Sequence, residues 1–197
     1  EVFFLRAALD AIGPGAPIRT TMLDGARLDP ARLGHLDVVI MANPGSVSAA
    51  SLAALRGFTR QGGGLFITAG DRLTAETARV LDDLLPIPLR GHKQVADPSD
   101  PNAALSALHI TDFDLDHPVT ALFASVDDVS LLKARTYRVA LLDPTGRPAR
   151  VLASFTGGLP ALVEGQHGEG RTMLLTTTVD RDWSDLALRT SFVPLIH

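Results

Sequence analysis

A short apolar segment between glycines and a tight turn most constrains how this chain can fold. Three glycines, Gly62 to Gly64, precede Leu65 to Thr68, which we expect to form a buried strand, and Ala69, Gly70 and Asp71 follow as a turn. A sharp strand-to-turn geometry of this kind raises one side chain above a sheet edge, where many enzymes place a nucleophile. Here Ala69 holds that place, and its methyl group can attack nothing. The sequence therefore predicts a site that lacks its nucleophile.

The segments around this turn alternate between strands and helices. Leu36 to Ala42 is a continuous apolar run, typical of a strand that is buried on both faces. A helix is expected from Ser48, a good N-cap, to about Gln61, and another from Thr74 until Pro86 ends it. This alternation favours a three-layer α/β fold built on a mostly parallel sheet. The N-terminal part adds two expected elements, a helix over 1–10 and a strand over 18–23.

The last third of the chain has the pattern of short strands and turns that is typical of antiparallel hairpins. Short apolar segments follow one another closely and are separated by turns rich in glycine and proline. The expected strands are 137–142, 150–155, 161–164 and 172–177. Residues 86–118 are expected to be largely loop, with a short helical turn at 103–108. The pattern predicts one α/β domain over 1–197, with an antiparallel C-terminal extension.

Composition excludes several classes of function. The chain has 197 residues, no cysteine and a formal net charge of -4. The lack of cysteine rules out disulfides, thiolate metal sites and cysteine nucleophiles, and no basic cluster suits a nucleic acid. No apolar run reaches the ~20 residues needed to cross a bilayer, so we expect no transmembrane segment in this piece. Both ends run in apolar sequence without caps, which indicates a domain excised from a longer protein.

One acidic cluster invites a metal hypothesis. Asp112, Asp114 and Asp116 alternate along the chain and His117 follows them, so an extended segment would place three carboxylates on one side. Such oxygens suit a hard cation, but the pattern lacks the turn glycine and the distal glutamate of a calcium loop. We interpret the segment as an edge strand followed by a turn at His117, and we expect no metal and no cofactor.

Three segments of the sequence occur in the order and spacing found in a known family. They are Gly62 to Asp71, Asp116 to Leu122, and Gly168 to Arg171 leading into a strand. Together they resemble class I glutamine amidotransferase-like domains, especially the ThuA-like branch. A narrower set is similar to a domain of bacterial membrane proteins that also carry an aerotolerance-type region and a von Willebrand A domain: Leu36 to Asn43, the triple glycine, Gly168 to Thr178, Asp180 to Leu186 and Phe192 to Leu195.

The resemblance implies a fold, a location and a loss of catalysis. The fold would be a flavodoxin-like three-layer sandwich, and the domain would be a soluble part of a membrane-anchored bacterial protein, with the periplasmic side slightly favoured. Its partners would be other domains of that protein or of its complex. Active relatives keep a cysteine after the strand equivalent to Leu65 to Thr68 and a histidine after the strand 172–177, where this chain has Ala69 and Thr178 to Asp180. Without both groups the thiolate mechanism is gone, so we expect a non-catalytic interaction or ligand-sensing module.

We expect a ligand or partner site where the carboxyl ends of the strands meet, as in other open α/β sheets. Its candidate residues are Thr68, Ala69, Gly70, Asp71, His117, Asp180, Asp182, Trp183, Ser184 and Asp185. The alternative is a ThuA-like hydrolase or carbohydrate-processing enzyme that uses Asp and His residues, with His117 or His167 reaching a hydroxyl through folding.

The same residues also have a purely structural interpretation. Asp71 and Ser184 would then cap a turn and the final helix, and Asp182 would order its loop. Trp183 would pack over the sheet edge beside Arg181 paired to a carboxylate, rather than offer a binding platform.

Overall fold

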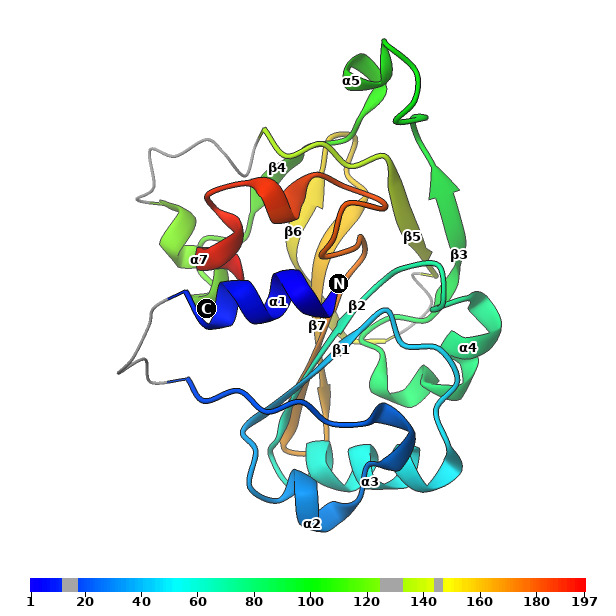
Figure 1. Ribbon diagram of the computed structural model, residues 1–197, viewed down its shortest axis with the longest axis vertical. Helices are drawn as coiled ribbons and strands as arrows, with labels where there is room; N and C mark the ends of the chain where they lie inside the picture. Colours follow the sequence, from blue (N-terminus) through cyan, green and yellow to red (C-terminus); the bar gives the residue numbers. More distant parts are fainter. Residues whose placement is uncertain (12–17, 125–132, 144–146) are drawn as a thin grey trace.

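The structure is built around one six-stranded sheet. This computed structural model describes residues 1–11, 18–124, 133–143 and 147–197. The strands of the sheet lie in the order β1-β2-β8-β7-β6-β4, and β3 and β5 form a separate two-stranded ribbon (Figure 1). Their bounds are β1 Val38–Ala42, β2 Gly64–Thr68, β3 Leu89–Gln94, β4 Ile110–Phe113, β5 Arg138–Leu142, β6 Ala149–Phe155, β7 Pro160–His167 and β8 Gly170–Leu175.

The sheet is mixed, which corrects the expected mostly parallel one. The pairings β1-β2 and β2-β8 are parallel, whereas β8-β7, β7-β6 and β6-β4 are antiparallel. Tight turns join β6, β7 and β8, and strands joined in that way can only pair antiparallel, whereas parallel neighbours need a crossover such as the helix between β1 and β2. The α/β class is confirmed, and so is the antiparallel C-terminal part.

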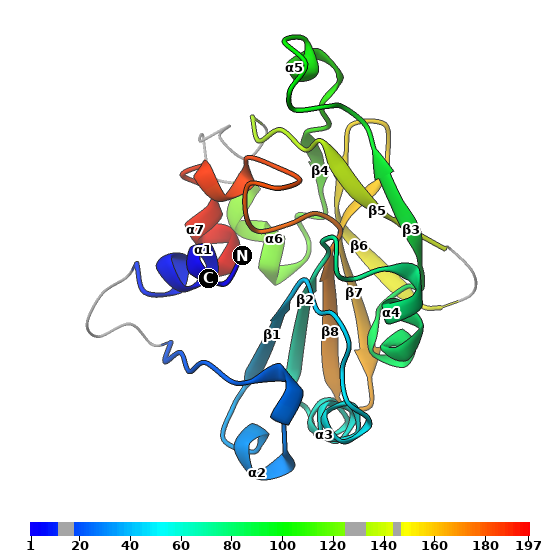
Figure 2. The same ribbon diagram turned by 45° about the vertical axis from the view of Figure 1, so that its right-hand side comes forward.

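Helices cover both faces of the sheet (Figure 2). The α-helices are α1 Val2–Leu9, α2 Pro30–Leu33, α3 Ala49–Arg60, α4 Ala75–Val80, α5 Ala103–Ser106, α6 Pro118–Ala121 and α7 Phe192–Ile196. Short 3-10 turns are η1 Gly25–Arg27, η2 Asp82–Leu84, η3 Leu122–Ala124 and η4 Leu186–Leu188. One core lies between the sheet and α3 with α4, and a second lies between the opposite face and α1, α6 and α7. Within the ranges that the structure describes, no helix is long and apolar enough to cross a membrane.

The unit β1-α3-β2 follows from local sequence signals. The Ser48 hydroxyl caps α3 by accepting from Ser51 N at 3.1 Å, and the apolar stripe of this helix packs on the sheet. Two glycines packed against the end of α3, Gly63 and Gly170, are needed sterically. A Cβ on Gly63 would lie 2.4 Å from the Phe58 ring, and one on Gly170 would lie 2.3 Å from the carbonyl oxygen of Thr59. The glycines therefore let the end of α3 lie directly against β2 and β8.

Other expectations need correction. Residues 18–24 contain no strand, although 18–23 was expected to be one. The segment 86–118, expected to be mostly loop, contributes β3, α5 and β4. The expected strand 137–142 is present as β5 but pairs with β3 rather than with the C-terminal hairpins. The turn expected after this strand includes residues 144–146, which lie outside the described residues.

Candidate functional site

The carboxyl ends of β1, β2 and β8 meet at one edge of the sheet, and Asn43 organises the turns there. Asn43 has a φ of 47°, and its backbone N–H donates to the Thr68 hydroxyl at 3.2 Å. Its side-chain oxygen accepts from the N–H groups of Arg72 at 2.8 Å and Leu73 at 3.2 Å. A Cβ on Gly70 would lie 2.3 Å from the Asn43 side chain, so glycine is required at that position. Asn43 therefore holds the turn after β2 from the neighbouring strand.

The residue at the expected nucleophile position is inside the protein. Ala69 is fully buried in the core beneath α3 and α4, and its N–H donates to Leu175 O at 2.9 Å. Thr68 is also buried, and its hydroxyl donates to Glu1 Oε2 at 3.1 Å. The turn thus does not raise the side chain of Ala69 above the sheet edge.

Asp71 is an exposed carboxylate at this edge and belongs to a four-residue cluster. Its Oδ1 accepts from Arg138 Nη1 at 2.5 Å and from Trp183 Nε1 at 3.3 Å. The Arg138 guanidinium also lies 4.7 Å from the Trp183 ring centroid, and His92 packs against the same ring edge-on at 4.7 Å. Because Trp183 is buried and holds both partners, the Asp71–Arg138 pair is fixed in place at the surface.

His92 is tied to the backbone at this edge. Burial, aided by the nearby charge of Arg138, lowers the pKa of His92 below its usual value. Its Nε2 lies 2.9 Å from the carbonyl oxygen of Leu73, and a carbonyl only accepts, so Nε2 carries the proton. The neutral ring is thereby tied to the backbone of the turn after β2.

The polar groups of the loop after β8 bind within the loop and to neighbouring segments. Asp180 Oδ1 accepts from Asp182 N at 3.0 Å, and the buried Ser184 hydroxyl donates to Thr178 O at 3.2 Å. Asp185 accepts from Arg135 N at 2.7 Å and forms an ion pair with Arg189. Asp182, expected to order the loop, is exposed, and Asp180 does so instead.

Two further details of the structural interpretation are corrected. The arginine beside Trp183 is Arg138 rather than Arg181, which is exposed. Ser184 does not cap the final helix: α7 begins after Ser191, and the Ser184 oxygen accepts instead from Leu186 N at 3.4 Å.

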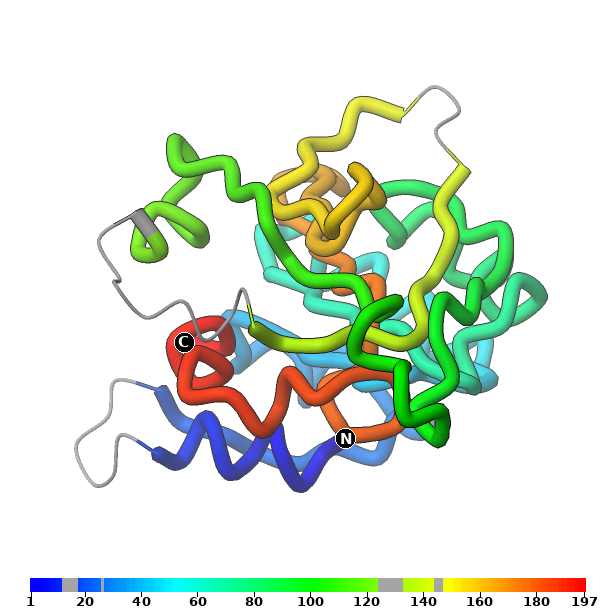
Figure 3. Tube along the Cα trace, turned by 90° about the horizontal axis from the view of Figure 1, so that it is seen from above, coloured from blue at the N-terminus to red at the C-terminus, as the bar shows by residue number. Residues whose placement is uncertain are grey.

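Glu1 is a site residue that the sequence did not reveal. Burial raises the pKa of its carboxyl to about 7, with a further contribution from the charge of Asp180. The first helix brings it there by lying beside the C-terminal segment, as the view from above shows (Figure 3). No motif marks such a contact, because it depends on how two distant segments pack.

The structure does not bring His117 to this edge. His117 begins α6, where its Nδ1 accepts from Val119 N at 3.3 Å, and its Nε2 lies 3.2 Å from Glu164 Oε2 on the face of the sheet. Asp112 and Asp114 bind Thr111 and Arg150 instead of converging. Among the described residues, no group of three or more His, Asp or Glu side chains is placed to hold a metal ion.

His167 does reach a hydroxyl. Its Nδ1 lies 2.7 Å from Thr59 Oγ1, and its Nε2 lies 3.7 Å from Asp83 Oδ2, an arrangement reminiscent of a hydroxyl–imidazole–carboxylate triad. Thr59, however, is 0% exposed, and its hydroxyl also contacts the Leu55 carbonyl within α3. Asp83 is already paired with Arg56. The contacts among Thr59, His167 and Asp83 therefore tie α3 to the β7-β8 hairpin and leave no access for a substrate.

Comparisons with known proteins identify the fold. No protein-family model matches the sequence, and no curated protein matches it. A cytoplasmic protein of Salmonella typhimurium LT2 aligns with a TM-score of 0.73 at 14% identity, over 98% of this chain and 83% of that one. A second cytoplasmic protein of Salmonella typhimurium aligns with a TM-score of 0.68 at 16% identity, over 98% and 82%. An exo-β-1,4-mannosidase from an Opitutaceae bacterium has a TM-score of 0.55 at 14% identity, over 98% of this chain but 27% of that one.

These likenesses correct the expected location. The two Salmonella proteins, which share the fold over nearly the whole chain, are cytoplasmic. This contradicts the expectation that the domain belongs to a membrane-anchored protein and faces the periplasm. At such identities the likeness shows the fold alone.

Proposed function

We propose that this chain is a non-catalytic, amidotransferase-like module that recognises a ligand or partner through the surface at the ends of β1, β2 and β8. One observation carries the proposal: the candidate nucleophiles at this edge, Thr68 and Ser184, are 0% and 1% exposed. Their hydroxyls already donate to Glu1 and to the Thr178 carbonyl. A substrate cannot reach them, and an accessible nucleophile is the first requirement of covalent catalysis. In this proposal, only the arrangement of β1, α3, β2 and β8 is flavodoxin-like.

The exposed part of this edge suits recognition. The Asp71–Arg138 pair is held by Trp183, so its charged groups are ordered before a partner arrives, and less entropy is lost on binding. Arginine and tryptophan are also the residues that most often dominate interface energies. Arg181 and Asp182 add exposed charges of both signs nearby. We therefore expect the partner to present polar groups of complementary charge. Other domains of a larger protein are candidates.

A second candidate is the hydrolase or carbohydrate-processing enzyme, which the fold likeness to the mannosidase favours. Its machinery would be the Thr59–His167–Asp83 chain, because this is where a histidine meets a hydroxyl. It would require α3 to open, since Thr59 is buried between the helix and the hairpin.

Turnover assays separate the two proposals. Wild-type protein, Ser184→Ala and Thr59→Val would be tested with glutamine, a nitrophenyl ester and nitrophenyl mannoside. We expect no turnover above buffer for any of them, since the hydroxyls of Thr59, Thr68 and Ser184 are all buried. Turnover that Ser184→Ala abolishes would overturn the proposal of a non-catalytic module. Turnover that Thr59→Val abolishes would establish the enzyme proposal.

The recognition role needs its own measurement. Partner capture would be compared between wild-type protein, Arg138→Ala and the control Arg90→Ala, which removes an exposed arginine from β3. A partner that wild type and the control capture but Arg138→Ala does not would support recognition through the surface at the ends of β1, β2 and β8, the strand-end surface. Equal capture by all three would place recognition elsewhere.

A further inference from the structure

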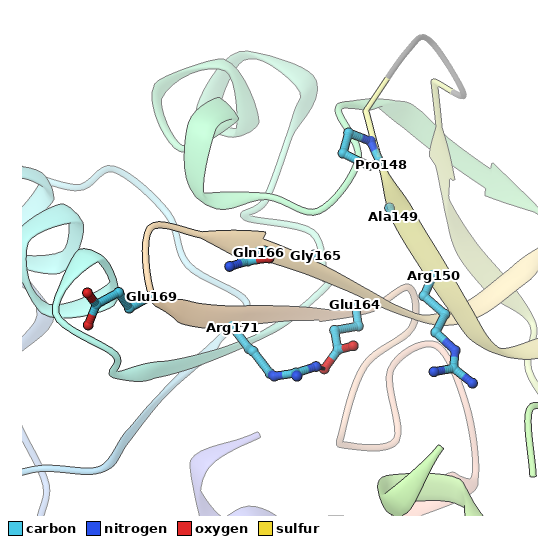
Figure 4. Close-up of a pocket in the computed structure, with 8 residues that line it drawn as sticks. All are labelled: Pro148, Ala149, Arg150, Glu164, Gly165, Gln166, Glu169 and Arg171. Atoms are coloured by element: carbon cyan, nitrogen blue, oxygen red, sulfur yellow. Dashed lines mark hydrogen bonds and ion pairs between the residues drawn. The ribbon is translucent and has the colours of Figure 1, made fainter. Parts of the chain in front are cut away.

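A polar groove lies at the other end of the sheet, away from the strand-end surface. It has a volume of about 410 Å³, within the range of small-molecule sites. Arg150 on β6, Glu164 on β7 and Arg171 on β8 project to the same side of the sheet there, and Gln166 and Glu169 also line the groove (Figure 4). Arg171 is near the start of β8, whereas Asp71 follows the end of the parallel strand β2. The two sites therefore occupy opposite ends of neighbouring strands.

Glu164 forms a fixed, buried floor for the groove. Its side chain is 8% exposed, and its Oε1 accepts from Arg171 Nη1 at 3.0 Å. Its Oε2 lies 3.2 Å from His117 Nε2. Since His117 Nδ1 accepts from Val119 N, the ring proton is on Nε2, which donates to the carboxylate. A carboxylate has about four acceptor positions, so two remain for a ligand.

Two guanidinium groups flank this floor, and each is anchored at one end. Arg150 stands directly opposite Glu164 in the β6-β7 register, and its Nε donates to Asp114. Arg171 is held by Glu164 but has a side chain that is 68% exposed. Between the residues that the structure describes, no hydrogen bond occupies the terminal nitrogens of Arg150 or the Nε and Nη2 of Arg171. Oriented donors thus remain available on both sides of the carboxylate.

The balance of charge decides the class of ligand. Arg150 is compensated by Asp114 and Arg171 by Glu164, and Glu169 adds a further negative charge. A free phosphate or carboxylate would need uncompensated positive charge, which the groove does not offer. Fixed donors and acceptors that alternate at strand spacing suit hydroxyl groups, because each hydroxyl both donates and accepts.

We propose that this groove binds a neutral polyhydroxylated ligand, a sugar or a related polyol. Glu164 accepts from adjacent hydroxyls, and Arg150 and Arg171 donate to their oxygens from either side. The site shares no residue with the strand-end surface, so it stands or fails independently of the proposed recognition role.

A titration followed by amide chemical shifts tests this site. The 15N-labelled chain would be titrated separately with D-glucose, D-galactose, D-mannose and myo-inositol, up to about 10 mM, the range of weak small-ligand affinities. We expect saturable shifts at Arg150, Glu164 and Arg171 with at least one of them. Affinity should fall at least about tenfold in Arg171→Ala and Glu164→Gln, each of which removes a group that contacts the ligand.

Controls keep the result decisive. Arg90→Ala should bind like wild type, and Arg171→Ala tests the site even if Glu164→Gln disturbs the buried His117. No saturable shift with any of the four polyols would overturn the proposal. So would unchanged binding by Arg171→Ala, or saturable binding of inorganic phosphate or sulfate at the groove in place of the polyols.

Discussion

At the scale of single residues, Asn43 shapes the strand-end surface. It adopts the left-handed backbone region, which asparagine tolerates better than most residues, and this directs its side chain toward the turn after β2. There it satisfies the N–H groups of Arg72 and Leu73, in space that Gly70 leaves open. One side chain thus sets the position of the backbone around Asp71.

We predict that Asn43→Ala destabilises the protein by about 1–3 kcal/mol, because it leaves the Arg72 N–H without its acceptor, leaves the Leu73 N–H with only the Gly70 carbonyl, and keeps an unfavourable φ. Urea unfolding measures the change. Asn102→Ala is the matched control, since Asn102 makes no side-chain capping bond to α5. A loss of under about 0.5 kcal/mol for Asn43→Ala would show that the turn after β2 does not depend on this side chain.

At the scale of elements, the C-terminal half of α3 is tied to two neighbouring elements. Arg56 donates to Asp83 through Nε at 2.6 Å and Nη2 at 2.7 Å, which joins α3 to η2. The Thr59–His167 contact joins the last turn of the same helix to the β7-β8 hairpin. These two contacts therefore hold α3 against η2 and against the β7-β8 hairpin.

The Arg56–Asp83 tie predicts a dependence of stability on pH. The hydrogen bond from Arg56 is the main cause that lowers the pKa of Asp83 below 3.8. A lowered carboxyl pKa adds stability above the unfolded value of 3.8, and this stability is lost as pH falls through the folded value. The side chains are 36% and 38% exposed, so solvent screening limits the contribution to about 0.5–1 kcal/mol.

Asp83→Asn should therefore lose about this amount at pH 7 and show a smaller loss of stability on acidification below pH ~4 than wild type. Urea unfolding at several pH values measures both effects. Asp37→Asn, at an exposed aspartate outside the pair, is the control. Parallel curves for Asp83→Asn and wild type at low pH would contradict the role of the pair.

Local signals explain which elements could be predicted from the sequence. The β1-α3-β2 unit and the C-terminal hairpins were predictable because caps, glycines and apolar periodicity lie within the segments themselves. The pairing of β3 with β5 joins residues about 50 positions apart and has no such signal. A sequence prediction also cannot decide which neighbour β8 takes, since that depends on packing of the whole chain.

The same limit applies to the candidate sites. Asp71 and Trp183 were both selected from the sequence, and the structure does bring them together, but Arg138, His92 and Glu1 were missed. The sequence does hold a signal for the groove, because the charged Glu164 directly follows the apolar run 160–163 within one strand. A buried charge needs partners, and that rule alone could have directed attention there.

At the scale of the whole molecule, the mixed sheet separates two surfaces. The parallel strands carry the strand-end surface at their carboxyl ends, and the antiparallel strands carry the groove near the start of β8. Arg138 and Arg171 represent these surfaces, and among the described contacts they share no partner: Arg138 binds Asp71 and Trp183, whereas Arg171 binds Glu164.

Distant sites without shared partners change stability additively, usually within about 0.5 kcal/mol. We therefore predict that Arg138→Ala and Arg171→Ala combine additively in urea unfolding of the double variant. The contrasting cycle is Glu164→Gln with Arg171→Ala, which should deviate from additivity because the two side chains bond each other. A coupling above about 1 kcal/mol between Arg138 and Arg171 would mean that the sheet links the two ends energetically, and binding at the groove would then be expected to alter the strand-end surface.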